Sequence, residues 1–111
     1  MYQKTVEAAR LEWTALEMPG VSMKTLSVDE ATGGMAVLTH IDSGASIPAH
    51  WHTNADETVY VLEGDFVEDG ISYGPGTFFV GKAGTTHIPH ASKNGCVVIT
   101  HFSAKLDFNL V

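Results

Sequence analysis

The chain has 111 residues and a formal net charge of −7, from 13 acidic and 6 basic side chains. This length predicts one domain, residues 1–111, with no room for a second hydrophobic core. The hydrophobic fraction of 44% is typical of a folded globular protein and excludes a disordered chain. The negative charge disfavours phosphate backbones and anionic lipid, so we expect neither nucleic acid nor a membrane as a partner.

Cysteine usage and the N-terminal segment indicate the compartment. The single cysteine, Cys96, can form no intramolecular disulfide, and its apolar run Cys96–Ile99 predicts a buried, unreactive thiol. Residues 1–13 contain no apolar stretch like that of a secretory signal, and no window approaches the roughly 18 apolar residues of a membrane span. We therefore expect a cytoplasmic protein.

The elements expected along the chain are almost all strands. Residues 5–16 fit a short helix or an edge strand equally well. After them, short runs of β-branched and aromatic residues alternate with turns rich in Gly, Asp, Asn and Pro. The spacing of these runs predicts an all-β fold, either a sandwich or an antiparallel barrel. The expected strands cover residues 35–41, 58–62, 66–67, 77–80 and 96–102.

Three histidines and a carboxylate carry the chemistry that the sequence predicts. His50 and His52 are two positions apart, so in a strand their side chains project to the same face. A short turn lets Glu57 return beside them, and His87 follows a glycine-rich turn. Imidazole and carboxylate groups suit zinc, iron, copper, manganese or nickel. We predict one divalent ion bound by these four residues, with two octahedral positions open; a metal-free polar cluster is the alternative, which burial makes costly.

These residues also resemble a known family. The run Gly44-x5-His50-x-His52-x4-Glu57-x6-Gly64 resembles the first cupin motif at every spacing. The run from Gly76 to His87 resembles the second motif, although Lys82 replaces the usual proline and Ala91 the usual asparagine. The resemblance covers about residues 21–103, with the motifs in 44–91. It implies an antiparallel jelly-roll β-barrel, the double-stranded β-helix of cupins, with the same four metal ligands.

Residues 59–70 and 73–77 narrow this resemblance to two groups with different activities. They are similar to the cupin-like domain of zinc-binding anti-sigma factors, which implies a non-catalytic zinc sensor or small-molecule-binding module. They are also similar to acetylacetone-cleaving dioxygenases, which implies an Fe(II)-dependent dioxygenase acting on a small oxygenated substrate such as a β-dicarbonyl. We expect the dioxygenase, because no sigma-binding domain is evident in the chain.

Several features of that function stay open at this stage. Iron is the expected metal, with zinc, manganese and nickel as alternatives, and isomerase or decarboxylase chemistry is compatible with the fold. The resemblance and the small core also favour a homodimer. No catalytic acid or base can be assigned, since Glu57 is predicted to bind the metal.

The remaining polar residues are interpreted as ordinary structural positions. His90 is expected in a loop at the barrel mouth, with a substrate contact as the alternative, and Lys82 in a solvated loop, with a role in steering anions as the alternative. We expect His40 and His101 to be satisfied or half-exposed strand residues. Trp51 is expected to point away from the two ligands beside it. A solvated turn is predicted for Asp65, Glu68 and Asp69.

Overall fold

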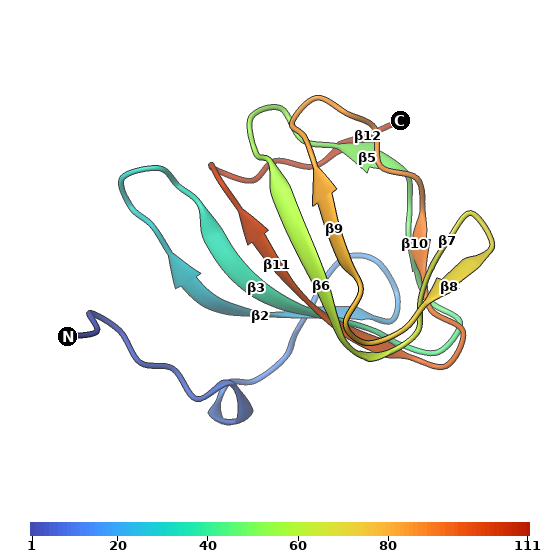
Figure 1. Ribbon diagram of the computed structural model, residues 1–111, viewed down its shortest axis with the longest axis horizontal. Coiled ribbons are helices and arrows are strands. Elements are labelled where there is room, and N and C mark those ends of the chain that lie inside the picture. Colours follow the sequence, from blue (N-terminus) through green and yellow to red (C-terminus); the bar gives the residue numbers. More distant parts are fainter.

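Twelve strands and one short 3₁₀ helix form the regular structure of the computed structural model, which describes residues 1–111 (Figure 1). The all-β prediction is therefore confirmed. No helix is long and apolar enough to cross a membrane. The elements are η1 (Ala8–Arg10), β1 (Thr14–Ala15), β2 (Val21–Val28), β3 (Met35–Ile41), β4 (Ser46–Ile47), β5 (His50–Trp51), β6 (Glu57–Gly64), β7 (Phe66–Glu68), β8 (Ile71–Tyr73), β9 (Phe78–Gly81), β10 (His90–Ala91), β11 (Cys96–Phe102) and β12 (Asn109–Leu110).

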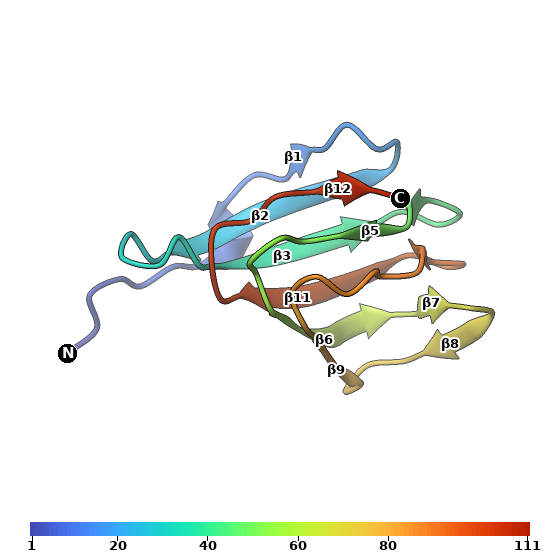
Figure 2. The same ribbon diagram turned by 90° about the horizontal axis from the view of Figure 1, so that it is seen from above.

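The strands form three antiparallel sheets that curl around a common interior (Figures 1 and 2). The largest sheet has the order β1-β2-β3-β11-β6-β9, and the others have the orders β4-β10-β7-β8 and β12-β5. Hydrogen bonding is not continuous around the interior, so the jelly roll is an open barrel. An isolated bridge between His50 and His87 connects β5 to the loop before β10.

Strand alternation explains how the sequence fills this interior. In β11, Cys96, Val98, Thr100 and Phe102 are buried, while the residues between them are half-buried or exposed. Val98 joins one core cluster with Ile41 and Phe66, and Phe102 belongs to a second cluster with Val37 and Ala55. The predicted burial of Cys96 is confirmed, and burial raises the pKa of its thiol.

The last glycine of the first motif has a steric role. Gly64 has a φ of +76°, and a Cβ at this position would lie 1.9 Å from the carbonyl oxygen of Gly95. Any side chain would therefore push apart β6 and the turn before β11. The glycine therefore permits the close approach of the end of β6 to the turn before β11.

The N-terminal residues 5–16, for which the sequence fitted a short helix or an edge strand, contain one of each. They form the single turn η1 and then the edge strand β1, which pairs with β2. The Lys24 ammonium lies over the Trp13 ring, 4.6 Å from its centroid, and donates a hydrogen bond to the carbonyl of Ala8 at 2.8 Å. The strand β2 was not predicted, because Lys24 in its middle obscured the apolar pattern. In the structure, the Trp13 ring and the Ala8 carbonyl partner this lysine.

Candidate metal centre

Three segments of the chain bring the four predicted ligands together inside the open barrel. His50 lies in β5 and His52 follows it, while Glu57 is the first residue of β6. His87 comes from the loop between β9 and β10. Its backbone exchanges two hydrogen bonds with that of His50, at N–O distances of 3.1 and 2.7 Å. The backbone itself therefore fixes the second motif against the first.

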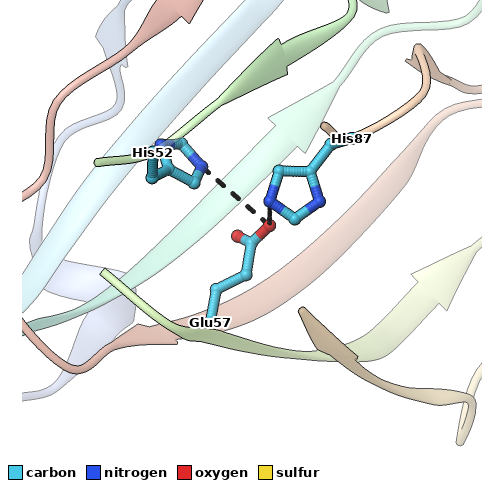
Figure 3. A group of neighbouring side chains, drawn as sticks. All are labelled: His52, Glu57 and His87. Carbon is cyan, nitrogen blue, oxygen red and sulfur yellow. Dashed lines mark ion pairs between the residues drawn. The ribbon is translucent and has the colours of Figure 1, made fainter. Parts of the chain in front are cut away.

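Three of the four side chains form a tight group (Figure 3). Nε2 of His87 lies 2.8 Å from Oε1 of Glu57, and Nε2 of His52 lies 4.0 Å from the same oxygen. One ligand atom of each residue lies within 4.8 Å of the others. The His50 ring adjoins this group without being part of it, with its centroid 4.9 Å from that of His52 and 5.2 Å from that of His87.

Backbone carbonyls orient two of the histidines. Nδ1–H of His50 donates to the carbonyl of Pro48 at 2.8 Å, and Nδ1–H of His52 donates to the carbonyl of Asp107 at 2.6 Å. Because the proton is on Nδ1, the Nε2 atom of each ring carries a free lone pair. Metal-binding histidines commonly have this arrangement, in which one ring nitrogen is held by the protein and the other binds the ion.

The buried nitrogen of His52 tests whether these residues fit a metal ion. Nε2 of His52 is buried and has no hydrogen-bond partner. A buried polar atom without a partner costs about 1–3 kcal/mol, which a coordinated cation would offset. Ligand atoms at 2.0–2.2 Å from one ion lie about 3 Å apart, so the atoms of this group, which lie within 4.8 Å of one another, would share an ion after a small inward movement. The donor set and its geometry fit a divalent ion better than a self-satisfied polar cluster.

The electrostatics of the group depend on its burial and on Glu57. Burial and, to a smaller extent, the neighbouring histidines His90, His52 and His87 lower the pKa of His50 to about 4. The hydrogen bond to Glu57 raises the pKa of His87, and although burial opposes ionisation of Glu57, its pKa is lowered by His87. Each of Glu57 and His87 therefore favours the charged form of the other, and a binding cation competes with the proton that the pair shares.

A cavity of about 610 Å³ opens onto the four predicted ligands His50, His52, Glu57 and His87, which we call the ligand group. His50, His52 and Glu57 form part of its wall, and most of the remaining lining is apolar. A smaller cavity of about 140 Å³ borders both Glu57 and His87. The ligand group is accordingly accessible to a small molecule and is not enclosed like a structural zinc site.

His90 and Glu68 differ from their predicted roles. Nδ1–H of His90 donates to Oε2 of Glu68 at 2.6 Å, and both side chains are mostly buried, so Glu68 is not part of a solvated turn. His90 lies in β10, borders both cavities and meets the His50 ring edge-on at 5.3 Å. Asp65 is also not free, because it accepts hydrogen bonds from Ser92 and the following loop. The sequence missed these pairs because each joins segments more than 20 residues apart.

The other candidates lie outside the site, as expected. His40 is half-exposed beside Asp42, and His101 is exposed on β11. Lys82 is 75% exposed, lies 3.8 Å from Asp56 and does not line the cavity. Trp51 is half-buried and absent from the cavity wall.

Residues 106–110, here named the closing strap, support the site and were not predicted. β12 pairs with β5, and Asp107 accepts hydrogen bonds from the backbone and side chain of Thr53. The Phe108 ring stacks on His50 at a centroid distance of 4.4 Å and an interplanar angle of 21°. A two-residue strand has almost no periodicity, so no sequence signal indicated it.

A further steric contact fixes His87. A Cβ at Gly81 would lie 2.7 Å from Cε1 of the His87 ring, closer than such atoms approach one another. The glycine at the end of β9 therefore leaves the space in which this ring lies. The second motif needs a glycine here for room, not for an unusual backbone conformation.

Comparison with protein families matches residues 1–105 to the ChrR cupin-like domain. The chain belongs to this family of cupins. A comparison with curated proteins found no significant match. KdgF from Halomonas sp. has 30% sequence identity to this cupin, with 92% of this chain and 94% of that chain covered and a TM-score of 0.78.

Two further solved structures correspond to the two groups that the sequence resembles. An acetylacetone dioxygenase from Acinetobacter johnsonii is 12% identical, with 97% of this cupin and 77% of that chain covered and a TM-score of 0.77. The anti-sigma factor ChrR of Rhodobacter sphaeroides, in complex with SigE, is 24% identical, with 86% and 50% covered and a TM-score of 0.69. These likenesses confirm the jelly-roll fold, and this cupin spans half of the ChrR chain.

Proposed function

We propose that this cupin is a metal-dependent dioxygenase that acts on a small oxygenated substrate such as a β-dicarbonyl. The observation that carries the proposal is the large cavity that opens onto the ligand group. Structural metal sites are closed, whereas catalytic ones keep positions open to substrate. The similarity to acetylacetone dioxygenases in fold supports the same reading.

The metal would be held by His50, His52, Glu57 and His87. We favour Fe(II), with zinc, manganese or nickel as alternatives, since this donor set binds all of them. When bound, a divalent ion supplies Lewis-acid polarisation of a substrate carbonyl. His50 would join the tight group of three by a small movement of its ring, whose Nε2 is free because Nδ1 is held by Pro48.

The residues around the ion would orient the substrate and exclude water. His90 borders the cavity, and because its Nδ1 is engaged by Glu68, its Nε2 is the nitrogen left to accept a hydrogen bond from a substrate hydroxyl. The apolar wall opposite lowers the local dielectric and strengthens such polar contacts.

The decisive experiment combines elemental analysis with oxygen uptake. Protein purified from its native host without chelator would be analysed for metals and then assayed for oxygen consumption with a panel of β-diketones. One equivalent of iron with substrate-dependent uptake supports the dioxygenase. One equivalent of zinc without uptake contradicts it, and absence of any metal contradicts the assignment of the site.

A second candidate is a non-catalytic zinc-binding module, sensing or binding a small molecule. It is favoured by the family, whose model is named for the ChrR cupin-like domain, and by the likeness to ChrR bound to SigE. The same elemental analysis separates the two functions. A zinc-loaded protein would then be tested for ligand-dependent association with a sigma factor of its host, by pull-down and calorimetry.

We also propose that two copies associate through the outer face of β6 and β9. Tyr60 and Phe78 are paired across the two strands and are 42% and 59% exposed, with Leu62 and Val80 beside them. An apolar group of this kind on one sheet face suits a twofold dimer, in which the same patch is used by both subunits.

A further inference from the structure

The wall of the large cavity is mostly apolar and contains no permanently cationic side chain. Eleven of its 19 lining residues are hydrophobic, and neither lysine nor arginine is among them. At about 30 Å³ per water in the liquid, 610 Å³ holds roughly 20 water-sized groups, far more than a metal with one or two waters needs. The cavity therefore has space for a substantial apolar group beyond the ligand group.

Charges near the cavity act against an anionic ligand. Glu17 lines it, Glu68 lies behind His90, and the chain carries a net charge of −7. A divalent ion with Glu57 would leave one net positive charge, enough for one bound oxygen anion. A second carboxylate would have no cationic partner, and burying an unpaired charge is strongly unfavourable.

The closing strap supplies a distinct part of the apolar wall. Leu106, Phe108 and Leu110 line the cavity, at alternate positions of an extended segment. Phe108 lies against His50, so a group bound near that ligand would also meet this ring. These residues lie outside the part of the chain that matches the family, residues 1–105. The closing strap is therefore a part of the wall that the family match does not describe.

We propose that the cavity binds an uncharged, mostly apolar molecule with two oxygen donors at one end, and that the closing strap forms the wall against which its apolar body packs. This inference rests on the proposed metal site, because the oxygen end is placed at the ion. It goes beyond the reaction type, because it predicts that the cavity does not bind dicarboxylates and prefers ligands with a large apolar group.

The test is equilibrium binding to protein loaded with Zn²⁺, which has no redox chemistry, so turnover is not needed. Acetylacetone, 1-phenylbutane-1,3-dione and malonate would be titrated by calorimetry. Replacing a methyl by a phenyl buries more apolar surface, so we expect the phenyl diketone to bind about tenfold or more tightly than acetylacetone. Malonate has similar donor spacing but two charges, and we expect it to bind at least about tenfold more weakly than acetylacetone.

Variants locate the binding wall. Leu106→Ala should reduce the phenyl advantage several-fold without changing zinc content, whereas Val111→Ala, at an exposed position outside the lining, should leave it unchanged. Met23 lies in β2 and lines the cavity, so Met23→Lys places a cation there and should raise the affinity for malonate about tenfold. The control is Ser22→Lys, at the neighbouring position, which does not line the cavity and should leave malonate affinity unchanged.

The outcomes separate this inference from the proposed function. A phenyl diketone that binds no better than acetylacetone, or malonate that binds equally well, overturns the inference even if iron-loaded protein consumes oxygen. The expected order of affinities in a protein that consumes no oxygen supports the inference while the dioxygenase fails. A protein that takes up no Zn²⁺ overturns both.

Discussion

The backbone carbonyl of Asp107 accepts a hydrogen bond from Nδ1 of His52 across 2.6 Å and 55 positions of sequence. The carboxylate of the same residue accepts hydrogen bonds from Thr53, and Asn109 donates to it at 3.2 Å. Asp107 thus orients a predicted metal ligand from outside the site, through the backbone that its own side chain holds in place.

Asp107→Ala should lower metal affinity because the carbonyl that orients His52 would lose its anchor. Loss of such a supporting contact typically weakens metal binding about 10–100-fold. The measurement is competitive Zn²⁺ titration against a chromophoric chelator. Asp42→Ala is the control, since Asp42 is exposed, pairs with His40 and does not line the cavity. Equal losses in the two variants would show that Asp107 acts only through general charge.

The free energy of unfolding in acid should also depend on Asp107. Hydrogen bonds from Thr53 lower the pKa of Asp107 to about 2, below its value of 3.8 in an unfolded chain. A lowered pKa stabilises the folded state above pH 3.8, and this contribution is lost as the pH falls through about 2. Urea unfolding of metal-free protein should therefore separate parent from Asp107→Asn above pH 4, with the difference shrinking towards pH 2. A constant difference would contradict the role of the carboxylate.

Gly81→Ala should displace His87 and leave the fold intact. The new Cβ would lie 2.7 Å from Cε1 of the ring, so the ring must move away from Glu57. We expect at least about tenfold weaker Zn²⁺ binding. Gly74→Ala is the matched control, because a Cβ there meets no atom within 4 Å and should leave metal binding unchanged. Circular dichroism checks that both variants fold.

Removal of a ligand should have a larger effect than removal of another histidine. His87→Ala deletes the partner of Glu57, whereas His101→Ala removes an exposed side chain of β11. We expect metal content, measured by elemental analysis after dialysis, to fall sharply in the first variant and to stay near the parent value in the second. The ligand assignment is wrong if both variants, or neither, lose metal.

Phe78→Asp should dissociate the proposed dimer, because it places a charge in the apolar face of β6 and β9. Sedimentation velocity should give about twice the 11.9 kDa chain mass for the parent and a single chain mass for the variant. Ile71→Asp, on a different sheet and 54% exposed, is the control and should stay dimeric. A monomeric parent would exclude this interface.

The sequence predicted what depends on local pattern. β3 and β11 begin and end at the predicted residues because their side chains alternate regularly between core and surface. The spacing of His50 and His52 was informative for the same reason. β2 was missed because Lys24 interrupts its apolar pattern, and the partners of that lysine, the Trp13 ring and the Ala8 carbonyl, lie beside it only in the folded chain.

What could not be predicted is the part of the site that forms between distant segments. Glu68 was interpreted as solvated from its place in an acidic turn, although His90, 22 positions later, forms a buried pair with it. The hydrogen bond from His52 to the Asp107 carbonyl likewise joins residues that are far apart in the sequence. A pairing of this kind carries no local periodicity, so it becomes visible only once the chain is folded.

The closing strap also has a consequence for the order of folding. The strands β3, β6 and β11 form the centre of the main sheet without residues 106–110, whereas the orientation of His52 requires them. The strap joins the rest of the fold through a two-residue strand pair, β12 with β5, whereas β11 pairs over its whole length with both β3 and β6. An end held by so few contacts opens more easily than the centre of a sheet. The barrel can therefore assemble before the predicted metal ligand His52 is fully oriented, and the rate at which refolding protein gains metal affinity would report when the last strand pairs.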